Sequence, residues 1–287
     1  MNFRTDLAIE MREAHPHPDD GFKSEESDIG DVKITKIEIL NRQGEQALGK
    51  PKGRYITVES TSFAGDYSIN PDCLLALKTE IFRLLPKTGP VLICGIGNTE
   101  ITPDALGPKT ASLILATRHI SGELAKAAGL GDLRPVAVMS PGVLGQTGVE
   151  TGEMIQGVLD RVKPAAVIVI DALASRRLSR LGCTVQLSDT GIVPGSGVGN
   201  ARSEISMRTL GIPVLSIGVP TVVDAKTLVQ DLTDCETDDT RASASQMVVT
   251  PKEIDLIIDR AARLIAHAVN CALQPQVDPE DLLLLVG

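Results

Sequence analysis

Short apolar segments recur along this chain, and they alternate with segments whose apolar residues are spaced as in helices. Residues 91–94, 165–170 and 213–218 are apolar almost throughout, as expected of strands that are buried on both faces. Helical spacing appears between them, for example over residues 151–162. The alternation predicts an α/β fold: a single domain with a largely parallel central sheet flanked by helices.

The first 60 residues have a different pattern. Residues 32–40 and 53–60 place an apolar side chain at about every second position, which predicts half-exposed strands and therefore an N-terminal β-rich extension. Residues 7–30 are mostly polar or charged and are interrupted by proline. Such a composition buries little apolar surface, so we expect residues 7–30 to form a flexible N-terminal extension.

Two aspartates stand at the predicted ends of buried strands. Residues 91–94 lead through a glycine-punctuated turn to Asp104, which we place in the first turn of a helix. Residues 165–170 run directly into Asp171, a position that also suits the N-cap of a helix. Because open α/β sheets bind their ligands at the carboxyl ends of strands, we expect Asp104 and Asp171 to meet there.

A pair of neighbouring carboxyl groups has a definite chemistry. The two groups cannot both ionise easily, so one keeps a proton while the other can activate a water molecule. That arrangement hydrolyses peptide or amide bonds. Asp171 is the expected base, although the roles of Asp104 and Asp171 can be exchanged because a coupled pair titrates as a unit.

Two glycine-rich loops, at residues 140–148 and 188–200, follow predicted strands. The first is equally consistent with a plain connection and with a wall of a substrate groove. The second could offer backbone amides to an oxyanion, or its glycines could simply give flexibility. The candidate residues for contact with a substrate or an oxyanion are Gly142, Gln146, Thr147, Gly195 and Gly197.

Composition and charge exclude several classes of protein. The 287 residues are 43% hydrophobic and carry a net charge of -9, with no cluster of Lys and Arg, so we expect no direct contact with nucleic acid. The five cysteines lack a CxxC spacing, which favours reduced thiols in a cytoplasmic protein. No apolar run is long enough for a membrane span, and we expect no membrane partner.

Other chemistries have weaker support in the sequence. The glycines at 95 and 97 lack the third glycine of a dinucleotide-binding loop, and neither a P-loop nor a GxSxG motif is present. None of the four histidines stands at a predicted strand end, which leaves a zinc site without a nitrogen ligand. We therefore expect no cofactor and no bound metal.

Four segments in order, GIGNTEITPDALGPK, SPGVLGQTGVETGE, VIVIDALASR and SDTGIVPGSGVGNAR, resemble the germination proteases of endospore-forming bacteria. That family degrades small acid-soluble spore proteins during germination. The resemblance implies a fold similar to that of hydrogenase maturation proteases, in which metal ligands correspond to Asp104 and Asp171. The third ligand of those proteins, a histidine, has no match here, and this favours a metal-free aspartic mechanism.

The resemblance also implies a precursor that processes itself. Family members remove a short N-terminal segment at a site with an acidic residue, then an apolar residue, then alanine, with glutamate shortly after. Residues 6–10, DLAIE, fit that pattern and predict cleavage between Asp6 and Leu7. Residues 1–6 would then be a propeptide and residues 7–287 the peptidase domain. The family further implies a homotetramer located in the spore core.

Two alternatives remain open from the sequence. The first is a metal-assisted maturation protease that acts on a partner protein. The second is a catalytically silent module that holds a peptide in the same crevice.

Overall fold

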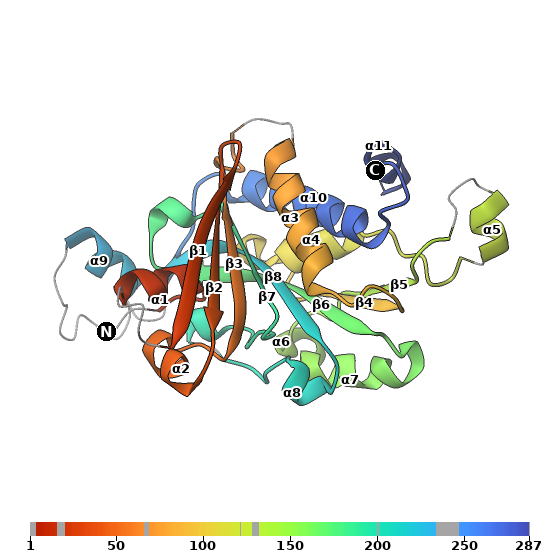
Figure 1. The fold of residues 1–287 in the computed structure, drawn as a ribbon. Helices are drawn as coiled ribbons and strands as arrows, with labels where there is room; N and C mark the ends of the chain where they lie inside the picture. Colours follow the sequence, from red (N-terminus) through yellow and green to blue (C-terminus); the bar gives the residue numbers. More distant parts are fainter. Residues whose placement is uncertain are drawn as a thin grey trace.

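One mixed sheet organises the part of the chain that the computed structural model describes, which is residues 4–15, 21–65, 69–120, 122–127, 132–199, 201–233 and 247–286. Its strand order is β1-β2-β3-β7-β8-β6-β4-β5, and β9 pairs with β8 (Figure 1). The strands are β1 (Phe22–Ile29), β2 (Val32–Ile39), β3 (Gly53–Glu59), β4 (Val91–Gly95), β5 (Val136–Met139), β6 (Ala166–Ser175), β7 (Thr184–Ser188), β8 (Val214–Asp224) and β9 (Val248–Val249).

Helices cover both faces of the sheet. In Figure 1, α3, α4, α10 and α11 lie above it, α6, α7 and α8 lie below it, and α1 and α2 lie beside the lower ends of β1 to β3. The helices are α1 (Ala8–Ala14), α2 (Arg42–Leu48), α3 (Pro71–Leu84), α4 (Leu106–Ser112), α5 (Gly122–Ala127), α6 (Leu144–Thr147), α7 (Thr151–Val162), α8 (Met207–Leu210), α9 (Ala225–Thr233), α10 (Ile254–Leu273) and α11 (Pro279–Val286).

The predicted α/β fold with helices flanking a large sheet is confirmed. The strands β8, β6, β4 and β5 pair in parallel and form the part of the sheet expected from the apolar segments. The N-terminal strands β1, β2 and β3 continue the same sheet through antiparallel pairs, and β7 joins them to β8. The β-rich extension is therefore an extension of the central sheet itself.

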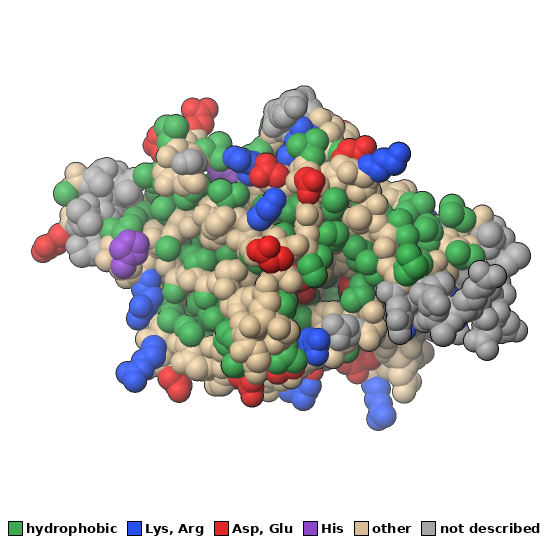
Figure 2. Space-filling model, turned by 180° about the vertical axis from the view of Figure 1, so that it is seen from behind, with side chains coloured by type: hydrophobic (Ala, Val, Ile, Leu, Met, Phe, Trp, Pro, Cys, Tyr) green, Lys and Arg blue, Asp and Glu red, His purple; other side chains and the backbone are tan. Residues whose placement is uncertain are grey.

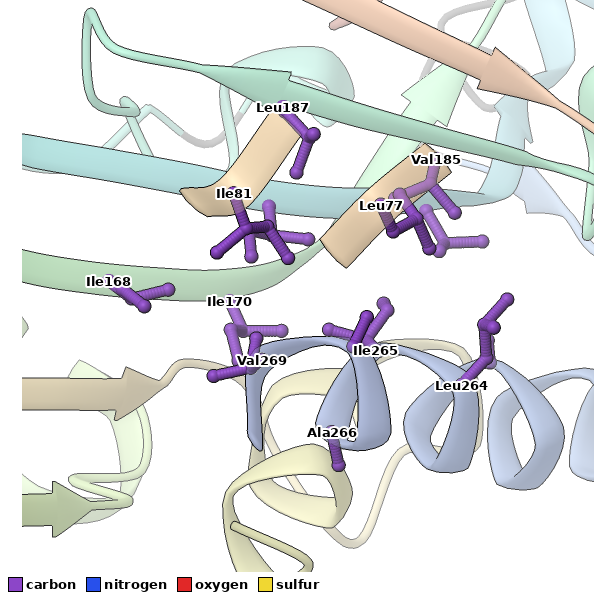
Figure 3. Packing of buried hydrophobic residues seen from close by; sticks show 14 of the residues in the cluster. Leu77, Ile81, Ile168, Ile170, Val185, Leu187, Leu264, Ile265, Ala266 and Val269 are labelled. Carbon is purple, nitrogen blue, oxygen red and sulfur yellow. The ribbon is translucent and has the colours of Figure 1, made fainter. Parts of the chain in front are cut away.

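The main hydrophobic core lies between the sheet and α10. Figure 3 shows Ile265 and Val269 of α10 pointing toward Ile170 of β6 and toward Ile81 of α3. Leu77 from α3 joins this cluster, and burial of each such side chain contributes about 1.5–3 kcal/mol. The even-numbered residues of β6 face this core, so its odd-numbered residues, Asp171 among them, face the opposite side.

The expectation of a flexible extension is wrong for residues 7–15 and 21–30, while residues 16–20 lie outside the described residues. Leu7 and Ala8 are fully buried at the start of α1, and Phe22–Ile29 is strand β1. The strand is ordered by its hairpin with β2, whose turn at Gly30 and Asp31 joins the partners Ile29 and Val32. Backbone pairing thus orders a segment whose side chains are too polar to indicate a strand.

The predicted strand end at Asp171 is also wrong, because β6 continues to Ser175. The residues that follow Asp171 pair with β8 up to Val223, with a shift of register between Leu173 and Ala174. Asp171 is therefore a strand residue and not the N-cap of a helix.

Surface charge and helix hydropathy add two observations. On the face seen in Figure 2, Lys and Arg side chains are scattered among acidic and uncharged ones instead of forming one basic area. Within the described residues, none of the helices combines the length and the apolar composition that crossing a membrane requires.

Close backbone packing holds α4 against the strand ends, which gives a test of the fold. A Cβ atom at Gly107 would lie 2.2 Å from the carbonyl oxygen of Ile96 and 2.4 Å from that of Ile170. We therefore expect Gly107→Ala to lower the free energy of unfolding by about 1–3 kcal/mol, measured by urea denaturation. Gly157→Ala is the control, because nothing lies within 4 Å of a Cβ atom there, and it should stabilise α7 by about 0.5–1 kcal/mol. Equal effects of the two substitutions would contradict this account.

Candidate active site

The site forms where two neighbouring parallel strands separate. β4 ends at Gly95, whose partner on β6 is Ile170, and the amide of Ile96 still donates to the Ile170 carbonyl at 2.8 Å. β6 continues past the end of β4 and stays paired with β8. Asp171 is therefore the first residue of β6 that has no partner on β4. The chain that leaves β4 turns away and returns as the 3-10 helix Thr102–Asp104.

Asp104 is held by the turn that follows β4. Gly97 adopts a φ of +126°, and a Cβ atom there would lie 1.9 Å from the Asp104 carbonyl oxygen, so only glycine allows this approach. The amide of Asn98 donates to Asp104 Oδ2 at 2.8 Å. This hydrogen bond fixes the carboxylate toward the loop and leaves its other oxygen for a second partner.

The negative charge of Asp104 acts on the carboxyl group of Asp171. Asp171 is 5% exposed, and burial followed by the negative charge of Asp104 raises its pKa well above the ordinary value. The amide of Ala172 donates to Asp171 Oδ1 at 2.9 Å and opposes that shift. Burial also raises the pKa of the half-buried Asp104, while the Asn98 hydrogen bond lowers it. The structure thus brings Asp104 within electrostatic range of Asp171, and their joint catalytic role stays a prediction.

A nearby thiol is not a competing nucleophile. Cys94 precedes the end of β4 on the same face of the sheet as Asp171. Burial, with a smaller contribution from the charge of Asp171, raises the pKa of Cys94 to about 12. The thiol therefore stays protonated near neutral pH and lacks the thiolate that nucleophilic attack requires.

The loop at residues 140–148 reaches the site through Asn98. Gln146, in α6, donates from Nε2 to Asn98 Oδ1 at 2.7 Å. The backbone amide of Asn98 in turn donates to the Asp104 carboxylate. Gly142 has a φ of +74° and lies beside the Gln146 side chain. Thr147 closes the loop with a hydrogen bond from its hydroxyl to the Val149 carbonyl at 3.1 Å.

The loop with Gly195 and Gly197 lies against the N-terminal segment. A Cβ atom at Gly197 would be 2.1 Å from Asp6 Oδ2, and Ser196 Oγ donates to Asp6 Oδ1 at 2.8 Å. The Ala174 amide donates to Asp6 Oδ2 at 2.9 Å, and the Asp6 amide donates to the Ala174 carbonyl at 2.9 Å. This loop therefore contacts the Asp6 side chain. The charge of Asp6 also contributes to the raised pKa of Asp171.

Two residues that the sequence prediction missed contact the main chain of the same segment. Gln186 of β7 binds both the Asp6 carbonyl and the Ala8 amide, and Lys50 binds the Asp6 carbonyl. No motif surrounds either residue, and only the fold brings them beside the N-terminus.

Across the ranges that the structure describes, no group of three or more His, Cys, Asp or Glu side chains is arranged to hold a metal ion. Cys235 and His17, which the sequence contains, lie outside the described residues.

The buried carboxyl group of Asp171 predicts a pH-dependent stability. Above its unfolded pKa of about 3.8, the folded state holds a proton that the unfolded state has lost, so stability falls as pH rises through the raised pKa. Asp171→Asn removes this titration while keeping an acceptor for the Ala172 amide. We expect the variant to melt at a higher temperature than the wild type at pH 8, with the difference shrinking toward pH 4. The exposed Asp160→Asn is the control, and a difference that does not change with pH would contradict the assignment.

Known proteins resemble this chain along nearly its whole length. A family model described as germination protease matches residues 5–237. The chain is 42% identical to the germination protease of Caldanaerobacter subterraneus subsp. tengcongensis, over 98% of this chain and 97% of the relative. It is 40% identical to that of Clostridium perfringens, over 98% of each chain, and 35% identical to that of Bacillus subtilis, over 97% and 95%.

A solved structure is similar at lower identity. The [NiFe] hydrogenase maturation protease HycI from Thermococcus kodakarensis is 18% identical, with a TM-score of 0.38, over 66% of this chain and 98% of that one. The family model and the full-length relatives decide the assignment. The chain belongs to the germination protease family.

Proposed function

We propose that this chain is an endopeptidase that begins the degradation of small acid-soluble spore proteins during germination, with Asp104 and Asp171 as its catalytic dyad. The observation that supports the dyad is the coupling of a buried carboxyl group, Asp171, to a second carboxyl group at the point where β4 and β6 separate. Family membership supports the peptidase activity and its place in germination.

The two environments suggest a division of roles within the dyad. Asp171 is the more deeply buried group and keeps the shared proton more readily. Asp104, steadied by the Asn98 amide, is then the ionised partner that takes a proton from water. This reverses the assignment of the base made from the sequence. The water oxygen attacks the peptide carbonyl carbon, and the proton on the dyad passes to the leaving nitrogen.

The glycine-rich loops would complete the substrate groove. Gln146, bonded to Asn98, ties residues 140–148 to the Asp104 turn, so Gly142 and Thr147 would border the groove on that side. Gly195 and Gly197 would border it where the Asp6 side chain lies.

Self-processing at the N-terminal segment is part of the same proposal. The peptide bond between Asp6 and Leu7 is the proposed cleavage site, with residues 1–6 as the propeptide and residues 7–287 as the peptidase domain. Its support is the position of Asp6, whose charge acts on Asp171 and whose side chain is bound by Ala174 and Ser196. The chain would thus be made as a zymogen that carries its own cleavage site next to the dyad.

Assembly and location are proposed from the resemblance. We propose a homotetramer that works without a cofactor in the cytoplasm of the spore, the spore core. The side chains of Leu283, Leu284 and Leu285 on α11 are 42%, 82% and 46% exposed, and such an apolar surface is suited to contact with another copy. Light scattering of the full-length protein measures the number of subunits.

Two other functions can be separated by simple assays. Full activity after exhaustive chelation excludes a metal-assisted maturation protease. Turnover of a peptide with an acidic-apolar-alanine site excludes a silent peptide-binding module.

Asn substitutions test the dyad. We expect Asp104→Asn and Asp171→Asn each to slow self-cleavage and peptide hydrolysis by about 10²–10⁴-fold, because each removes a proton donor or acceptor from the reaction. The rates are measured by intact-mass spectrometry of the full-length protein and by hydrolysis of a synthetic peptide with the sequence of residues 4–14.

The exposed Asp160→Asn serves as the matched control and should retain the wild-type rate. Wild-type rates in either dyad variant refute the proposed mechanism.

A further inference from the structure

The N-terminal segment lies across the sheet face that carries Asp171. Leu7, Ala8 and Ile9 belong to one hydrophobic cluster with Leu173 of β6 and Tyr55 of β3. The carboxylate of Glu10 accepts from the amides of Arg176 and Arg177 at 2.6 and 2.9 Å. The segment is thus bound at its two acidic residues, Asp6 and Glu10, and at the apolar residues 7–9 between them. A peptide substrate is bound in a groove in the same way.

Two side chains converge on one carbonyl oxygen of this segment. Gln186 Nε2 donates to the Asp6 carbonyl at 3.0 Å, and Lys50 Nζ donates to the same oxygen at 3.1 Å. Gln186 Oε1 also accepts from the Ala8 amide at 2.7 Å, so this side chain spans both sides of Leu7. The bond between Asp6 and Leu7 is therefore fixed in register by its main chain as well as by its side chains.

The sheet places Gln186 on the face that carries Asp171. Gln186 of β7 pairs with Gly218 of β8, and Gly218 pairs with Asp171 of β6. Residues paired across neighbouring strands point to the same face, so Gln186 and Asp171 share one row separated by a residue without a side chain. A cavity of about 280 Å³ lies at the Gln186 end of this row and is lined by Asp6, Lys50, Gln186 and Gly218, among others. That volume has room for several water molecules.

We infer that Lys50 and Gln186 are catalytic residues that stabilise the oxyanion formed on the carbonyl of the cleaved bond. The inference rests on the proposed function, in which the dyad cleaves after Asp6. It assigns the stabilising donors to two side chains, while the Gly195–Gly197 loop binds the acidic side chain that precedes the cleaved bond.

The reaction balances with these groups. One aspartate accepts a proton as the water oxygen bonds to the Asp6 carbonyl carbon, and the C=O electron pair moves onto the oxygen that Lys50 and Gln186 hold. The pair then returns, the bond from that carbon to the Leu7 nitrogen breaks, and a proton from the dyad goes to the nitrogen. The products are a carboxylate on Asp6 and an amine on Leu7.

Self-cleavage of the full-length protein tests the inference. We expect Lys50→Met and Gln186→Met each to slow cleavage at Asp6 by about 10²-fold or more, the usual effect of losing one oxyanion donor. Lys50→Arg, which keeps a donor, should stay within about tenfold of the wild type. The exposed Lys52→Met is the matched control, and melting temperatures show whether each variant is folded.

A second measurement separates catalysis from simple anchoring of the segment. Hydrogen exchange over residues 5–11 is compared in Asp171→Asn and in Asp171→Asn combined with Lys50→Met or Gln186→Met, so that all precursors stay intact. The inference is supported if the Met variants cleave slowly while residues 5–11 keep their protection from hydrogen exchange.

The inference is overturned by any of three results. These are slow cleavage with protection from hydrogen exchange lost, wild-type cleavage rates in both Met variants, and cleavage at another bond. The proposed function is tested separately by Asp171→Asn. Wild-type cleavage by this variant refutes the dyad. If Asp171→Asn is inactive while the Met variants are fully active, the inference about Lys50 and Gln186 fails and the dyad stands.

Discussion

The proposed chemistry depends on the different lengths of β4 and β6. Because β4 ends one residue short of Asp171, the chain can turn at Gly97 and bring Asp104 back beside the longer strand. A buried carboxyl group with a second carboxyl group as its neighbour cannot ionise freely, and the pKa of Asp171 is raised accordingly. The packing of Gly107 against the main chain of Ile96 and Ile170 keeps this geometry fixed.

In the proposed function, the N-terminal segment would connect this constraint to regulation. The same residues that fill the hydrophobic cluster at Leu7 and Ala8 hold the proposed cleavage site against the sheet face. A precursor that occupies its own groove would exclude other peptides until the segment is released. Arg180 strengthens this attachment, since it forms a salt bridge with Glu13 at 2.6 Å and lies near Glu10.

Much of the fold could be predicted from the sequence because buried parallel strands have a direct signature. The apolar residues 91–94 and 165–170 predicted β4 and β6, and the aspartates that follow them are the pair proposed as the dyad. The end of β6 could not be predicted, since Ala172 to Ala174 suit a helix as well as a strand and only pairing with β8 decides between them.

The other misses have the same origin in long-range contacts. β1 is ordered by hydrogen bonds to β2, which its polar side chains do not reveal. Gln186 contacts the Ala8 amide across 178 positions of sequence, and no local pattern indicates such a contact.

The central claim, a proton shared by two aspartates, is tested most directly by ¹³C NMR titration of the Asp171 carboxyl group in the folded, full-length protein. We predict a titration well above 3.8 that moves down when Asp104 is replaced by Asn, whereas a midpoint near 3.8, or one unaffected by Asp104→Asn, would contradict the dyad.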